Sequence, residues 1–151
     1  MQRDCRYPIE SLLAHRPPML LLDRVIGYDN NTLIADVTIT RSSLFLSPRG
    51  VPAHVAIEYM AQACGAFAGA MALDAGEPVK IGFLLGTRRC RLLVPWFRIG
   101  DRLVVSASVN FRDERMALFD CKTEVDGHLA ADAQLKVYQP DNDLLQIDED
   151  V

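Results

Sequence analysis

Residues 51–73 read V-P-A-H-V-A-I-E-Y-M-A-Q-A-C-G-A-F-A-G-A-M-A-L, the longest apolar and helix-favouring run in the chain. The run predicts one long, buried central helix, because a helix that is apolar or small on nearly every side must be covered on nearly every side. Pro52 lies where a first-turn proline loses no hydrogen bond, and Gly76 supplies the left-handed residue that commonly ends a helix. A transmembrane span is disfavoured, because the run contains an ionisable residue, many small residues and no basic flank.

Two polar side chains interrupt this apolar run. Glu58 and Gln62 are one turn apart on the same helix face, and His54 precedes Glu58 by one turn. Two interpretations are open at this point: a core helix whose glutamate faces the surface, or a helix that carries a catalytic acid into an apolar pocket. Burial among apolar groups raises the pKa of a carboxyl group in general, which would suit such an acid to donating a proton near neutral pH.

The composition limits the classes of protein to which the chain can belong. At 151 residues it is long enough to bury a core, and we expect a single domain, 1–151. The net charge of -4 argues against a nucleic-acid-binding surface, and the charged residues 1–7 argue against a secretory signal. The four cysteines are far apart, with no C-x-x-C pair and no histidine at metal-ligand spacing. We therefore expect a cytoplasmic protein with reduced thiols, without a membrane span, a metal or another cofactor.

Short strand-like segments surround the predicted helix. A short helix is predicted at 8–13, before a pair of prolines. Strands are predicted at 19–28, 32–40, 79–93, 102–112, 116–125 and 128–138. Gly86 predicts a bulge in its strand, and Asp126-Gly127 predicts a tight hairpin between the last two strands. The acidic segment 139–151 is expected to be a flexible tail.

These elements predict an α+β architecture. Because no helical pattern separates the last four strands, parallel crossovers are excluded, and we expect those strands to meander antiparallel in chain order. A single apolar helix between strands is best covered by one curved sheet that wraps it.

Four motifs, in order along the chain, carry a resemblance to a known family. Residues 13–25, L-A-H-R-P-P-M-L-L-L-D-R-V, resemble the L-P-H-R-Y-P-F-L-L-V-D-R-V motif of the β-hydroxyacyl-acyl carrier protein dehydratases of fatty acid synthesis. Residues 57–65, I-E-Y-M-A-Q-A-C-G, resemble their helix motif L-E-A-M-A-Q-A-x-G. Later, G-D-R-L at 100–103 and D-G-H-L-A-A-D-A at 126–133 match G-D-x-L and D-G-x-x-x-A-x-A. The resemblance covers about residues 13–138 and implies the hotdog fold, an antiparallel β-sheet wrapped around one long central helix.

The resemblance also implies an activity. Enzymes of this family dehydrate a 3-hydroxyacyl-acyl carrier protein thioester to the trans-2-enoyl thioester, with a histidine as base and a glutamate as acid. Glu58 matches that glutamate, but the family histidine, in an H-F-P-x-x-P motif fourteen residues earlier, is replaced here by Leu44. The string G-V-P-A-x-x-x-I-E-Y-M-A-Q at 50–62 is most similar to the divergent dehydratase-like proteins found with aryl polyene biosynthesis.

Another group would have to replace the missing histidine. Dehydration needs one proton to leave the carbon next to the thioester and another to reach the departing hydroxyl. His54 lies four residues before Glu58 on the same predicted helix face, and His15 lies in the H-R-x-P loop, which in the resembled family borders the acyl tunnel. Either histidine is a candidate base, because imidazole titrates near neutral pH.

Further residues are expected to bind the substrate. The backbone N–H groups of Ala53 and of the following residue, which lack intrahelical acceptors at a helix start, are expected to hold the thioester carbonyl. Gln62 is expected to orient Glu58 or a water molecule. Pro52 and Phe45 are expected to border the acyl site.

The expected partners follow from the same resemblance. Arg88, Arg89 and Arg91 are candidates for binding an acidic acyl carrier protein. The resembled proteins are dimers in which each site takes its histidine from one chain and its glutamate from the other. We therefore expect a homodimer, or a heterodimer with a related hotdog chain that supplies the histidine. Two alternatives remain open: a hotdog acyl thioesterase in which Glu58 activates water, and a non-catalytic acyl-binding subunit.

Overall fold

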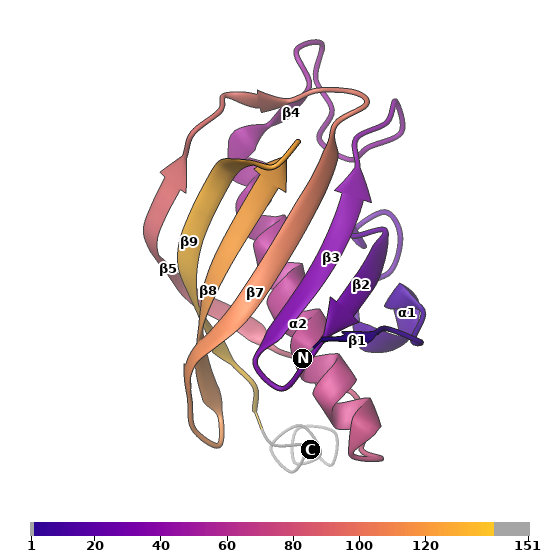
Figure 1. Ribbon diagram of the computed structural model, residues 1–151, viewed down its shortest axis with the longest axis vertical. Coiled ribbons are helices and arrows are strands. Elements are labelled where there is room, and N and C mark those ends of the chain that lie inside the picture. Colours follow the sequence, from indigo (N-terminus) through magenta and orange to yellow (C-terminus); the bar gives the residue numbers. More distant parts are fainter. Residues whose placement is uncertain (1, 141–151) are drawn as a thin grey trace, which may run out of the picture.

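The computed structural model describes residues 2–140, in which one seven-stranded sheet curves around one long helix (Figure 1). The elements before the long helix are β1 (Arg3–Asp4), α1 (Ile9–Leu12), β2 (Arg24–Tyr28), β3 (Thr32–Thr38), β4 (Val51–Pro52) and the 3₁₀ turn η1 (Ala53–Val55). The long helix is α2 (Ala56–Asp74). The strands after it are β5 (Phe83–Leu92), β6 (Trp96–Phe97), β7 (Arg102–Arg112), β8 (Met116–Val125) and β9 (His128–Tyr138). Most of the predicted acidic tail, 141–151, lies outside the described residues.

The predicted central helix is confirmed, but α2 begins at Ala56 instead of residue 51. Val51 and Pro52 instead form β4, which pairs with β6. Pro52 has an extended ψ of 138°, so it precedes the helical turns and is not a first-turn proline. The chain adopts this path because the backbone of residues 51–53 is bonded to the segment before β7.

The end of α2 follows the prediction. Gly76 has a φ of +72°, and its N–H donates to the carbonyl of Leu73 at 3.0 Å. The N–H of Glu77 donates to the carbonyl of Ala72 at 2.8 Å. This pair of bonds satisfies the last carbonyls of the helix and ends it as a Schellman motif.

The sheet confirms the predicted antiparallel wrapping but not the whole predicted strand order. The order is β1-β2-β3-β7-β8-β9-β5, so β7, β8 and β9 form a meander while β5 joins the far side of β9. The expectation that the four last strands follow one another is therefore wrong for β5. The reason is that β7 takes β3 as its other neighbour and the chain between β5 and β7 makes the β6 pairing. Figure 1 shows β5 at the edge of the sheet.

One predicted turn, one predicted bulge and one strand boundary can be compared directly. Asp126 and Gly127 both have positive φ, 53° and 77°, and form the predicted hairpin between β8 and β9. The predicted bulge at Gly86 is confirmed by a register shift against β9. The strand predicted at 19–28 is confirmed only as β2, because the N–H of Leu21 bonds a side chain of α2 and not a neighbouring strand.

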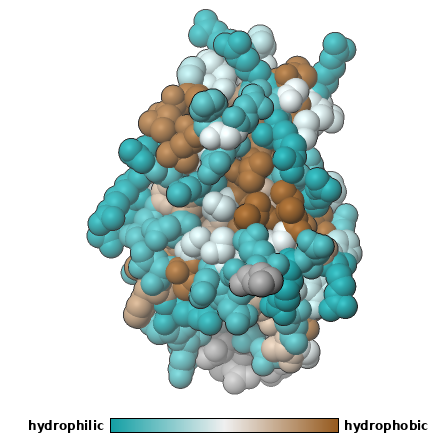
Figure 2. Space-filling model, in the orientation of Figure 1, coloured by the Kyte–Doolittle hydropathy of each residue, from teal (hydrophilic) through white to brown (hydrophobic). Residues whose placement is uncertain are grey.

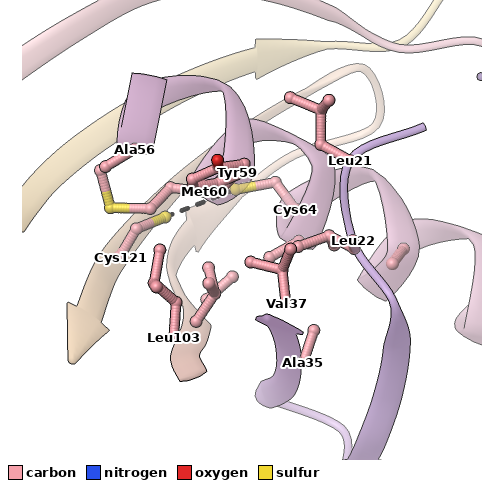
Figure 3. Close-up of a cluster of buried hydrophobic side chains, with 14 of the residues drawn as sticks. Leu21, Leu22, Ala35, Val37, Ala56, Tyr59, Met60, Cys64, Leu103 and Cys121 are labelled. Atoms are coloured by element: carbon pink, nitrogen blue, oxygen red, sulfur yellow. Dashed lines mark hydrogen bonds between the residues drawn. The ribbon is translucent and has the colours of Figure 1, made fainter. Parts of the chain in front are cut away.

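The core lies between α2 and the inner face of the sheet (Figure 3). Phe67 of α2 meets Phe119 of β8 edge to face, with ring centroids 5.7 Å apart. Cys64 and Cys121 bring their sulfur atoms within 3.5 Å in the same layer, and all four cysteines are free thiols. Among the described residues, no helix combines the length and the apolar character that crossing a bilayer requires.

The free edge of the sheet is unusually apolar. On and beside β5, several large apolar side chains are exposed, with exposed fractions from 41% to 53%: Ile81, Phe83, Leu84, Leu85, Leu92 and Leu93. Figure 2 shows a brown patch at the upper left, where β5 ends. An edge strand that exposes unpaired backbone and apolar side chains is a typical site of association with another chain.

Candidate active site

Glu58 and His15 lie side by side at the surface of the core. Glu58 is in the first turn of α2, and His15 is in the loop that follows α1. The Nε2 atom of His15 is 3.7 Å from Oε1 of Glu58, and the two side chains are 39% and 38% exposed. Both groups are therefore half-buried and close enough to exchange a proton after a small movement.

Gln62 holds the carboxyl group of this pair in place. Its Nε2 atom donates a hydrogen bond to Oε1 of Glu58 at 3.2 Å and another to the carbonyl of Met19 at 2.7 Å. Its Oε1 atom accepts a bond from the N–H of Leu21 at 2.9 Å. Gln62 is only 1% exposed, and its hydrogen bonds orient Glu58, as expected, and anchor the segment before β2.

The loop that carries His15 is held by its own backbone. Arg16 donates through one guanidinium nitrogen to the carbonyls of Leu13 and His15, both at 2.8 Å. The Nδ1 atom of His15 is buried and has no hydrogen-bond partner among the described residues. A buried ring nitrogen without a partner is costly.

A cavity of about 210 Å³ opens beside Glu58 and His15, and we call it the catalytic cavity. Its apolar wall includes Leu13, Ala61, Gly65, Phe83 and Leu84. These residues come from the end of α1, the middle of α2 and the start of β5. The cavity is thus suited to a hydrocarbon chain next to a polar reacting end.

The structure separates the other expected site residues from this cavity. His54 is exposed in η1, and neither His54 nor Pro52 or Phe45 borders the cavity. The side chain of Phe45 is 51% exposed, and its backbone has a φ of +69°. The N–H of Ala53 donates to the carbonyl of Pro95 at 3.1 Å. The expectation that the N–H of Ala53 is a free donor for the substrate carbonyl is therefore wrong, because this N–H already donates to the segment beside β6.

In this chain Leu44 stands where the resembled family has its histidine. Leu44 is partly buried and lies against the core.

Among the arginines proposed for carrier binding, Arg91 is paired with Asp132, whose pKa is lowered by that hydrogen bond. Arg88 and Arg89 are exposed.

One wall of the site is not apparent from the sequence. Residues 80–84 border the catalytic cavity although they lie beyond the end of α2. No sequence pattern indicates that 80–84 form this wall, because the approach of 80–84 to α2 depends on β5 pairing with β9 at the far side of the sheet.

Within the described residues, no three potential metal ligands lie close enough together to hold a metal ion.

A carboxyl group and an imidazole at this separation, at the mouth of an apolar cavity, can give one proton to an acyl chain and take another from it. Such proton transfer, on a helix wrapped by an antiparallel sheet, characterises the dehydratase class of hotdog-fold proteins.

Comparison with known proteins places the chain within that class. The family of ApeP-like proteins, described as ApeP dehydratase, matches residues 7–148, and the chain belongs to this family. The 3-hydroxyacyl-[acyl-carrier-protein] dehydratase FabZ of Streptococcus pneumoniae serotype 4 is 32% identical over 138 residues, which cover 84% of this chain and 91% of that protein. FabZ of Halorhodospira halophila is 31% identical over 134 residues, covering 85% and 87%.

A solved structure shows the same fold at similar identity. A chain of the dehydratase heterocomplex ApeI:P from Xenorhabdus doucetiae superposes with a TM-score of 0.88 at 32% identity, covering 95% of this chain and 98% of that one. The predicted hotdog fold and the predicted family are both confirmed.

Proposed function

We propose that this protein dehydrates a 3-hydroxyacyl thioester carried on an acyl carrier protein to the trans-2-enoyl thioester. The observation that carries the proposal is the 3.7 Å separation between His15 Nε2 and Glu58 Oε1 at the mouth of an apolar cavity. Membership of the ApeP-like dehydratase family and the similarity to FabZ support the same reaction.

His15 acts as the base and Glu58 as the acid. Neutral His15 removes a proton from the carbon next to the thioester through Nε2, and protonated Glu58 gives its proton to the departing hydroxyl, which leaves as water. The products of the two transfers are an imidazolium and a carboxylate that already face each other. Transfer of the proton from Nε2 back to the carboxylate then restores both groups, so no further proton carrier is needed.

His15 fits this role better than His54 does. His54 neither borders the catalytic cavity nor makes an ion pair with Glu58 in residues 2–140. With Nε2 free to act as base, the neutral ring of His15 carries its proton on Nδ1, which is the buried atom without an acceptor.

We propose that a second subunit, another hotdog chain, binds along β5. Since β5 is the last strand of the sheet, its outer edge lacks a neighbouring strand in the described residues, and its side chains are apolar and exposed. The similar Xenorhabdus doucetiae chain belongs to a heterocomplex, which makes a related but different chain a candidate beside a second copy. Light scattering of the purified protein, alone and co-expressed with a related hotdog chain, distinguishes the two assemblies.

The acyl carrier protein as partner and the cytoplasm as cellular location are inferred from the proposed chemistry. Arg88 and Arg89 are exposed beside the apolar edge and offer positive charge to an acidic acyl carrier protein. Four free thiols suit the reducing cytoplasm in which the carrier-bound substrate would be made.

Mass spectrometry of a 3-hydroxyacyl group on an acyl carrier protein tests the reaction. We expect the wild-type protein to remove one water from the acyl group and Glu58→Gln to abolish this loss. Glu10→Gln is the matched control, because Glu10 is an exposed residue of α1 outside the cavity. Release of free acid would instead indicate a thioesterase.

A non-catalytic role remains a second candidate because Leu44 replaces the family histidine. If the wild-type protein binds the acyl carrier without any change in acyl mass, and turns it over only with a second hotdog chain, this chain is a partner-dependent subunit. Inactivity of Glu58→Gln within that complex would still assign the acid to this chain.

A further inference from the structure

Arg16 follows the candidate base His15 directly in the chain, and its side chain turns back onto the loop that carries this histidine. One guanidinium nitrogen, Nη1, donates to the carbonyls of Leu13 and His15, both at 2.8 Å. These carbonyls belong to two peptide groups that lie on either side of the backbone of His15. Holding both groups to one atom fixes the direction in which the imidazole leaves the backbone.

The chain that follows the loop cannot supply this support. Pro17 stands four residues after Leu13, where a continued helix would place the donor for the carbonyl of Leu13, and proline has no N–H. The helix α1 has already ended, and Leu13 has an extended ψ of 148°. In the described part of the chain, both loop carbonyls find their donor in Arg16. A side chain thus replaces the backbone bonds that a helix or strand would provide.

The backbone of Arg16 is held by the same segment that Gln62 holds. The carbonyl of Arg16 accepts a bond from the N–H of Met19 at 2.9 Å. The carbonyl of Met19 accepts a bond from Gln62 at 2.7 Å, and Gln62 also donates to Glu58 at 3.2 Å. Hydrogen bonds therefore lead from Arg16 through the segment before β2 to Glu58. The 3.7 Å contact between His15 and Glu58 closes this ring.

Arg16 is exposed and does not border the catalytic cavity. Exposed hydrogen bonds contribute little to the stability of a fold, because water competes for both partners. Proton transfer is more demanding, because the reacting atoms must come within hydrogen-bond reach, and a displacement of about 1 Å can cost about a hundredfold in rate. Two bonds that matter little for the fold can therefore matter for the reaction.

We propose that Arg16 is a positioning residue whose guanidinium group fixes the backbone of His15 so that Nε2 faces Glu58. Gln62 fixes the candidate acid from the other side of the same ring. The consequence for the reaction rests on the proposed dehydratase function, in which His15 is the base. The geometric part, that Arg16 keeps His15 beside Glu58, can be measured without turnover.

Arg16→Met keeps the aliphatic stem and removes both hydrogen bonds. For a 3-hydroxyacyl pantetheine thioester, we expect kcat to fall by about tenfold to a hundredfold, with KM within about twofold of the wild-type value. This substrate has no protein carrier, so a loss of carrier binding does not enter the comparison. We expect the midpoint of urea unfolding to stay close to that of the wild type.

Arg98→Met is the matched control, because Arg98 is also exposed and outside the catalytic cavity, and we expect it to leave kcat unchanged. Wild-type kcat in Arg16→Met would overturn the proposal. A higher KM with an unchanged kcat would show that Arg16 binds the substrate, contrary to the proposal. Unfolding of Arg16→Met would show a role in the fold alone and would equally overturn it.

Arg16→Lys tests whether the hydrogen bonds carry the effect. Because a single nitrogen of Arg16 makes both bonds, an ammonium group with three donors can replace it. We expect Arg16→Lys to recover kcat to within about fivefold of the wild-type value. An Arg16→Lys protein as slow as Arg16→Met would contradict the proposed role of these two bonds.

Nuclear magnetic resonance separates this proposal from the proposed function. A nuclear Overhauser effect between the ring protons of His15 and the methylene protons of Glu58 reports their contact without turnover. We expect this effect in the wild type and in Arg98→Met, and its loss in Arg16→Met. If this pattern holds but no substrate is dehydrated, the reaction is wrong and the positioning role stands. If the effect is absent from the wild type or persists at full strength in Arg16→Met, the positioning role is wrong whichever reaction the protein performs.

Discussion

The amide of Gln62 donates a hydrogen bond to the carboxyl of Glu58 from one turn further along α2, over 3.2 Å. The same side chain holds the backbone of Met19 and Leu21, so it connects the candidate acid to the segment before β2. A single buried amide thus serves both the position of Glu58 and the stability of the fold.

Replacing Gln62 by methionine keeps the shape of the side chain and removes these three bonds. We expect Gln62→Met to lower the free energy of unfolding by about 2 to 4 kcal/mol, because the N–H of Leu21 is left buried without an acceptor. Urea unfolding measures this loss. Glu58→Gln is the comparison, since its half-exposed carboxyl can be neutralised at little cost in stability. A Gln62→Met protein as stable as the wild type would contradict the anchoring role.

The base assignment predicts opposite results for two histidines. His15→Gln is expected to lower kcat for dehydration by about 10²- to 10⁴-fold, the range typical of losing a general base. His54→Gln is expected to leave kcat close to the wild-type value, because His54 is exposed and outside the catalytic cavity. Steady-state kinetics on one 3-hydroxyacyl substrate measures both. The reverse pattern would indicate that the base is His54 in η1.

The hydrogen bonds of Asp74 predict that the fold loses part of its stability at acidic pH. Asp74 accepts hydrogen bonds from Tyr7 at 2.6 Å and from Tyr28 at 2.9 Å, and Arg3 lies 3.5 Å away. The bond from Tyr7, followed by the bond from Tyr28, lowers the pKa of Asp74 below its usual value. A carboxyl group whose pKa is lower in the folded state stabilises the fold above its unfolded pKa of about 4, and this contribution is lost as the pH falls.

We therefore expect Asp74→Asn to lower the free energy of unfolding by about 1 kcal/mol at neutral pH, since the side chain is partly exposed. The difference from the wild type should shrink as the pH falls below about 4. Urea midpoints measured from pH 7 to pH 3 test this, with Tyr7→Phe as the variant that removes the largest cause of the shift. A difference that stays constant across this range would contradict the account.

The long helix and most strands were predictable because their patterns are local. An apolar run such as 51–73 must be buried, and the alternation in 102–112, 116–125 and 128–138 indicates strands without reference to any other segment. The starting residue of α2 was not predictable, because β4 forms only through its pairing with β6 much later in the chain.

The candidate site was predictable only in part, for the same reason. Glu58 stands out as a carboxyl in an apolar helix, and its helix neighbour Gln62 follows from the spacing of one turn. The same spacing favoured His54, but His54 lies in the tighter 3₁₀ turn before Ala56, where the α-helical spacing does not hold. The approach of His15 depends on the packing of α1 against α2, which no local pattern reveals.

Two glycines of α2 allow α1 to pack closely, and they differ in what surrounds them. A Cβ atom on Gly69 would collide with the backbone carbonyl of Leu12, whereas a Cβ atom on Gly65 would approach only the end of the Leu13 side chain, at 2.9 Å. Backbone cannot move aside without displacing α1, but a leucine methyl can rotate away.

Gly-to-Ala changes inside a helix otherwise stabilise it by about 1 kcal/mol, so any loss measures the collision. We expect Gly69→Ala to lower the free energy of unfolding by about 2 to 3 kcal/mol through overpacking, and Gly65→Ala to change it by less than about 1 kcal/mol. Urea unfolding of both variants provides the measurement. Because the displaced α1 leads directly into the loop of His15, Gly69→Ala should also lower kcat for a four-carbon substrate more than Gly65→Ala does. Equal stability of the two variants would show that α1 is not fixed by this contact.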